Sequence, residues 1–165
     1  MRESVFIDAG RAREVARREI AGGPAVGDPA FAAWQGAEPG EPLLVRDLAG
    51  RPAYWLVPVL RGEGSIVGTV RVLPDGRPAA AAALREGTAV AALDAAEAAR
   101  RAEREIDREA GETAGTPDLV HDGPPGREAW RIEVTWRGRP SRWLFVTPGG
   151  IYERPAGEAR DENLE

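Results

Sequence analysis

The sequence predicts an α+β fold made of two helix-plus-antiparallel-meander units, with the helices packed on antiparallel sheet. Three observations lead to this class. Two stretches carry apolar residues at helical spacing, each is followed by short segments with the alternation of β-strands, and the second group repeats features of the first. A chain of 165 residues is long enough for two small units that share an interface.

The first predicted helix begins after Asp8, whose carboxylate can accept a hydrogen bond from a backbone N–H of the first turn. A Gly-Gly-Pro sequence starting at Gly22 ends this helix. Its apolar residues fall on one narrow face: Ala12, Val15, Ala16 and Ile20. Phe31 and Trp34 follow in a stretch rich in Gly, Pro and Ala, so we expect them to anchor a loop or short helix to the core.

Three strands are expected next, and with the helix they complete a first unit over residues 1–80. Apolar and alternating segments place these strands at residues 43–47, 53–61 and 66–73. Pro58 has no backbone N–H to donate, so we expect a bulge or a sheet edge at this point of the middle strand. Glycine-containing turns bound the third strand, which makes the three a meander.

A second unit is expected over residues 88–155. Apolar residues at helical spacing predict a helix over residues 88–110, and Gly111 supplies its C-terminal stop. Four strands follow, at residues 118–122, 128–137, 142–147 and 151–154. The remaining residues, 156–165, are charged and predict a flexible acidic tail.

Strict alternation marks the strand at residues 128–137. The apolar set is Trp130, Ile132, Val134 and Trp136, and the intervening set is Arg131, Glu133, Thr135 and Arg137. Alternation of this kind is typical of an antiparallel sheet with one face on the core and the other in water. We expect the tryptophans Trp130, Trp136 and Trp143 to divide between the core and a binding surface.

An internal repeat relates the two units. The segment from Pro42 to Trp55 has a counterpart from Pro117 to Trp130, 75 residues further along the chain. Each segment contains a short strand that ends in Asp, a glycine-containing turn and the start of a long aromatic strand. The pattern favours duplication of one helix-plus-meander unit.

A helix followed by an antiparallel meander resembles the PepSY and cystatin-like (propeptide-like) domains, here in tandem. The resemblance rests on this order of elements and on the segments Val45–Trp55 and Gly68–Val72, and it covers residues 40–77 and 94–154. It implies a domain that binds or inhibits peptidases, or acts like a propeptide, without catalytic residues of its own. Those families are usually secreted or membrane-associated, whereas we read no leader in this sequence.

Composition removes several kinds of chemistry. All 22 basic residues are Arg, so no lysine can form a Schiff base or a P-loop contact. There is no Cys, and His121 is the single histidine, which rules out thiol nucleophiles and metal motifs with thiolates or paired histidines. We therefore predict no catalytic residues, no metal site and no cofactor.

Charge and hydropathy limit the classes of partner that the protein is expected to bind. The net charge of -5 argues against nucleic acid, because phosphate binding depends on concentrated positive charge. No segment has the roughly 20 consecutive apolar residues of a membrane span, and no signal peptide is seen, so we expect a cytoplasmic location. A protein or peptide remains the favoured partner, with the chain a monomer or a homodimer through a sheet edge.

Candidate binding residues lie around the second meander. Arginines cluster near two tryptophans, a combination that suits a phosphate or an acidic peptide: Arg137, Arg139, Arg142, Trp136 and Trp143. His121 is the one group expected to exchange a proton near neutral pH, and it lies at the end of a predicted strand. Asp47 and Asp122 precede glycine-containing turns, where a carboxylate usually bonds the backbone of its own turn.

These observations favour a non-enzymatic protein-binding or peptide-binding module, for which an exposed sheet edge could accept an extended peptide. The alternative is a small-molecule binder or hydrolytic enzyme in which a cavity between sheet and helix uses His121 as base. A purely structural or regulatory domain is the third possibility. A cavity lined by His121 and aromatic residues would favour the second function over the first.

Overall fold

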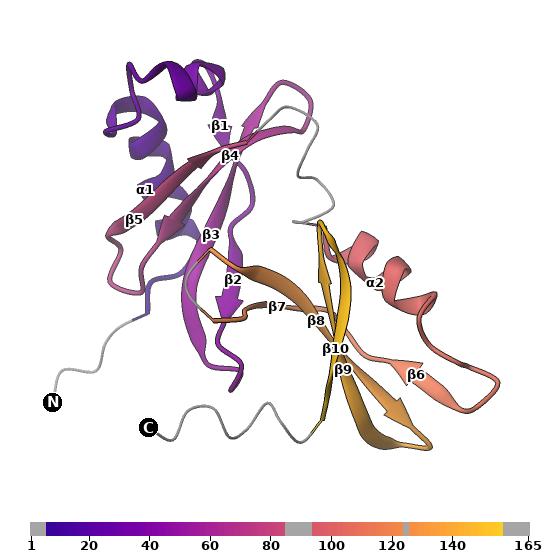
Figure 1. Cartoon of the computed structure of the whole chain (residues 1–165). Helices are drawn as coiled ribbons and strands as arrows, with labels where there is room; N and C mark the ends of the chain where they lie inside the picture. The colour runs from indigo at the N-terminus through magenta and orange to yellow at the C-terminus, as the bar shows by residue number, and fades with distance from the viewer. Residues whose placement is uncertain (1–5, 85–93, 124–125, 157–165) are drawn as a thin grey trace, which may run out of the picture. The chain divides into compact units, whose positions relative to one another are not determined.

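The computed structural model describes residues 6–84, 94–123 and 126–156 (Figure 1). It has a mixed α and β fold whose strands pair almost entirely antiparallel, as the sequence predicts. The chain divides into two compact units. Unit 1 comprises Met1–Val45 and Pro52–Val90, and unit 2 comprises Arg46–Arg51 and Ala91–Glu165.

The first helix of unit 1 confirms the predicted start and end. Helix α1 spans Ala9–Gly22, and the Asp8 carboxylate accepts a hydrogen bond of 2.7 Å from the Arg11 N–H at its first turn. Gly23 follows as the C-terminal cap, where its N–H bonds the Glu19 carbonyl. The short helix η1, a 3-10 helix over Pro29–Trp34, then carries both predicted aromatic anchors.

Five strands contribute to unit 1. These are β1 (Glu38–Pro39), β2 (Leu43–Arg46, whose last residue belongs to unit 2), β3 (Pro52–Arg61), β4 (Ser65–Val72) and β5 (Pro78–Ala83). Strands β3, β4 and β5 form the antiparallel meander, and β1 pairs with β3. The three predicted strands are therefore present, and β5 is an additional strand that the sequence patterns did not indicate.

The core of unit 1 joins α1 and η1 to the meander. Ala12, Val15 and Ala16 of α1 form one buried cluster with Trp34 and with valines of β3 and β4: Val57, Val59, Val67, Val70 and Val72. The register of β3 against β4 shifts between Val59 and Leu60, where Val67 of β4 is skipped, whereas Pro58 itself pairs regularly with Thr69; the irregularity therefore lies beside the proline, and its extra residue is on the neighbouring strand.

Unit 2 has one described helix and five strands of its own. These are α2 (Ala95–Glu103), β6 (Glu112–Ala114), β7 (Asp118–His121), β8 (Glu128–Trp136), β9 (Arg139–Thr147) and β10 (Gly150–Pro155). Strands β7 to β10 pair in sequence order, all antiparallel, and β6 pairs with β8. Among the pairings of the described strands, one is parallel, and it joins Arg46, at the end of β2, to Val120 of β7.

The second helix is shorter than predicted. The predicted start at residue 88 lies outside the described residues, and α2 ends at Glu103, well before Gly111. Asp107 explains the early end, because its side chain accepts from the Ala110 N–H at 2.9 Å and its own N–H donates to Glu112. These bonds form a turn that replaces the last predicted helical turns, and Gly111, at φ 93°, completes that turn.

Candidate functional site

The arginines and tryptophans predicted as a binding cluster separate into three places in unit 2. Trp136, Arg137 and Arg139 lie at the tip of the β8–β9 hairpin, where Arg137 has a positive φ of 49°. The Arg137 guanidinium stacks over the Trp136 ring at 4.6 Å, and the indole N–H of Trp136 donates to the Ala110 carbonyl at 2.9 Å. Trp136 is 45% exposed, so this tip is accessible.

Arg142 is occupied by partners within its own unit. Its guanidinium forms an ion pair with Glu112, lies 3.0 Å from Glu153 and donates to the Glu105 carbonyl at 3.2 Å. Hydrogen bonding between Arg142 and Glu112 lowers the pKa of the glutamate and raises the pKa of the arginine. Arg142 therefore holds β9 to the segment before β8 and contributes little to an open cationic surface.

Trp143 follows Arg142 on β9, so its side chain lies on the other face of the sheet from Arg142, beside Arg131. The Arg131 guanidinium stacks 4.6 Å from the Trp143 ring, and it binds the Asp118 carboxylate at 3.0 Å and the Leu48 carbonyl at 2.7 Å. Arg131 is only 7% exposed. The expectation that this face of β8 is in water is therefore wrong at Arg131, because the Asp118 carboxylate pairs with its charge and the Leu48 carbonyl accepts a second hydrogen bond.

The two aspartates before the turns differ. Asp47 bonds its own turn, as expected, since its carboxylate accepts from the Arg51 N–H at 2.9 Å. Asp122 is buried and binds the Tyr152 hydroxyl at 2.5 Å and Arg154 at 2.8 Å. The Tyr152 ring in turn stacks on Phe145, with ring centroids 4.9 Å apart. Asp122 thus ties the end of β7 to β10, a role that the turn pattern did not indicate.

His121 is half-buried at the end of β7, and its Nδ1 lies 2.9 Å from the Gly123 carbonyl. The adjacent Asp122 carboxylate is bound by Tyr152 and Arg154. Within the described part of the chain, no group of three or more His, Asp or Glu residues is placed to hold a metal ion.

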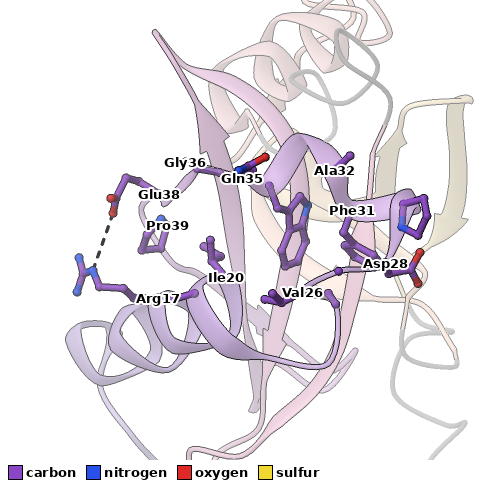
Figure 2. A pocket seen from close by; sticks show the side chains of 16 residues that line it. Arg17, Ile20, Val26, Asp28, Phe31, Ala32, Gln35, Gly36, Glu38 and Pro39 are labelled. Carbon is purple, nitrogen blue, oxygen red and sulfur yellow. Dashed lines mark ion pairs between the residues drawn. The ribbon is translucent and has the colours of Figure 1, made fainter.

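A cleft in unit 1 was not anticipated by the sequence. It lies between the C-terminal half of α1, η1 and the segments that flank η1, and it has a volume of about 620 Å³ (Figure 2). Aliphatic and aromatic side chains dominate its lining: Ile20, Ala21, Ala25, Val26, Phe31, Trp34, Ala37 and Pro39. Four polar side chains complete it: Arg17, Asp28, Gln35 and Glu38. His121 does not line this cleft.

The second unanticipated feature of unit 1 is the outer edge of β5. All six residues of this strand, Pro78–Ala83, are exposed, and none carries a charge. β5 pairs with β4 on one side, and no described strand pairs with its other side. Five consecutive alanines give no hydrophobic alternation and have low β propensity, which is why the sequence patterns did not predict this strand.

Comparison of the chain with protein-family models, with curated proteins and with solved structures gives no match. None of the helices in the described residues is long and apolar enough to cross a bilayer.

Proposed function

We propose that this protein is a non-enzymatic peptide-binding module that takes an extended peptide onto the outer edge of β5. The single observation that carries the proposal is the exposed, uncharged edge of this strand. In strand addition, backbone hydrogen bonds supply much of the affinity, so the receiving strand needs accessible N–H and C=O groups more than particular side chains.

The ladder between β4 and β5 determines which backbone groups point outward. The Leu84 N–H donates to the Val67 carbonyl, and the register continues through Ala82 opposite Thr69 and Ala80 opposite Arg71. Antiparallel strands alternate between hydrogen-bonded and non-hydrogen-bonded pairs, so Ala80 and Ala82 face β4. The N–H and C=O groups of Ala81 and Ala83 therefore point to the outer edge, where a peptide would pair.

The last strand of unit 2 provides a comparison within the same molecule. β10 also pairs with only one described strand, β9, but it carries Glu153 and Arg154. Charged residues on an edge strand discourage pairing with another chain, and β5 has none of them. The difference favours β5 as the edge that accepts a strand.

We further propose that the two units arose by duplication of one helix-plus-meander unit, which would make the β5 edge a specialisation of unit 1. Support comes from equivalent backbone details at the offset of the sequence repeat. The Gly40 N–H bonds the Pro58 carbonyl, and the Gly115 N–H bonds the Glu133 carbonyl. The register shifts in β3 and β8, after Val59 and Val134, also fall at this offset.

The proposal is tested by selecting peptides from a phage-displayed random library on the intact protein. Selected peptides are then titrated against Ala81→Pro, which removes an outward N–H, and against Glu153→Pro on β10 as the matched edge control. Ala81→Pro should weaken binding at least about tenfold, whereas the β10 variant should bind as the parent does. Full binding by Ala81→Pro, or a failure to select any peptide, would contradict strand addition.

A second copy of the chain is the other possible occupant of this edge, and sedimentation equilibrium without peptide distinguishes it. A monomer at concentrations where the selected peptides bind supports the proposal. A dimer that Ala81→Pro dissociates would assign the edge to self-association and overturn the peptide-binding function.

A further inference from the structure

The cleft in unit 1 has a fixed aromatic wall. Trp34 is 4% exposed, and its indole N–H donates to the Val67 carbonyl at 3.1 Å, which holds the ring in one orientation. Phe31 meets this ring edge to face, with centroids 4.8 Å apart and planes at 86°. A wall already held in place loses little freedom when an apolar group packs against it.

The lining of the cleft also exposes apolar surface that unit 1 leaves uncovered. Val26 is 57% exposed on the segment between α1 and η1. The cleft volume of about 620 Å³ falls within the range of roughly 300–1,000 Å³ that is typical of small-molecule sites. Size and lining therefore suit a compact apolar ligand.

The charged residues at the rim of the cleft indicate which charge the polar group of that ligand should carry. Arg17 is the one basic residue of the lining, and it already donates to Glu14 at 2.7 Å. Glu38 lies 3.9 Å from Arg17, and its side chain is 75% exposed, so its carboxylate remains accessible (Figure 2). Asp28 adds a second carboxylate. The acidic lining residues outnumber the basic one, and a cation is favoured over an anion.

We propose that this cleft binds a small molecule with an apolar body and a positively charged group, such as an amphipathic amine. The apolar body packs against Phe31 and the exposed Val26, with the buried Trp34 ring supporting Phe31 from behind, and the cation lies near Glu38. This site is separate from the β5 edge, and its function does not depend on peptide binding.

Three small molecules with hydrocarbon chains of similar length but different polar groups test the charge preference directly. Octylamine, octanol and octanoate are each titrated by calorimetry into the intact protein. We expect octylamine to bind most tightly and octanoate most weakly, with a difference of at least about fivefold between the amine and the alcohol. Equal affinities, preference for octanoate or no binding of any probe would overturn the proposal.

Two pairs of variants locate the site. Ala32→Trp places a bulky ring in the cleft lining, whereas Ala30→Trp lies on the same short helix outside that lining and serves as its control. Glu38→Gln removes the carboxylate, and Glu41→Gln is its exposed control. Ala32→Trp should abolish octylamine binding, and Glu38→Gln should reduce octylamine affinity to that of octanol. Unchanged octylamine affinity in both variants would show that the amine binds elsewhere.

Discussion

At the scale of single residues, Gly68 shows how one missing side chain positions another. A Cβ at Gly68 would lie 2.4 Å from the indole nitrogen of Trp34 and 2.6 Å from the Ala82 carbonyl oxygen. These separations are too short for unbonded atoms, so only glycine allows the Trp34 ring to lie on β4. The wall of the cleft therefore depends on a residue that does not line it.

Replacing Gly68 with alanine should destabilise unit 1. We expect Gly68→Ala to lower the free energy of unfolding by about 2 kcal/mol, measured by urea denaturation, because the indole or the β5 backbone must move. Gly22→Ala is the control, since nothing lies within 4 Å of a Cβ at that position. Equal stability of the two variants would contradict the close packing described at Gly68.

Two of the arginines in the β8–β9 hairpin, Arg137 and Arg142, should respond differently to charge reversal. Arg142→Glu puts a carboxylate beside Glu112 and Glu153, so we expect the melting temperature to fall by roughly 5 °C or more. Arg137 stacks on an exposed tryptophan at the hairpin tip, and Arg137→Glu should change the melting temperature little. Differential scanning calorimetry of both variants checks this, and equal losses would contradict the structural role of Arg142.

Tyr152 should make the stability of unit 2 decline at alkaline pH. Burial and the hydrogen bond to the Asp122 carboxylate raise the pKa of Tyr152 above its ordinary value. The unfolded chain then releases this proton first, at about pH 10, so the contribution of Tyr152 to stability is complete below about pH 10 and declines above it. Urea denaturation from about pH 9 to 11 should show a steeper loss for the parent than for Tyr152→Phe. Parallel curves would contradict the raised pKa.

At the scale of elements, sequence signals located most strands and the start of α1, because alternation, caps and glycine turns act locally. They failed in two places: at the end of α2, where a local side-chain hydrogen bond competes with the helix, and at β5, where the sequence pattern is weak. Asp107 ends α2 early through its own side-chain hydrogen bond, although apolar spacing continues to Ala110. β5 has no pattern of its own, and its pairing with β4 is what makes it a strand.

Proline scanning of β5 distinguishes its two sets of backbone groups. Ala82→Pro removes an N–H that faces β4 and should cost roughly 2 kcal/mol or more of unfolding free energy, whereas Ala81→Pro removes an outward N–H and should cost much less. Chemical denaturation of the two neighbouring variants measures the difference. A larger loss of unfolding free energy for Ala81→Pro than for Ala82→Pro would contradict the deduction that the Ala82 N–H, and not the Ala81 N–H, faces β4.

At the scale of the whole molecule, composition and patterning predicted the mixed fold but not the two binding features of unit 1. The residues singled out around Trp136 and Trp143 lie on two faces and a hairpin tip of unit 2, and only the pairing register determines which of them meet. The cleft brings together α1 and η1, and the β5 edge is recognised by the absence of charge on an outer strand. Both are properties of the tertiary arrangement that a linear pattern does not contain.

Amide hydrogen exchange of β5, followed by NMR with and without a selected peptide, tests the central claim most directly. In the protein alone, the outward amides of Ala81 and Ala83 should exchange quickly, and those of Ala80 and Ala82 should be protected. Peptide binding should slow exchange at Ala81 and Ala83 by at least about tenfold. Saturation with peptide without added protection at either amide would show that the peptide binds elsewhere and would contradict strand addition at this edge.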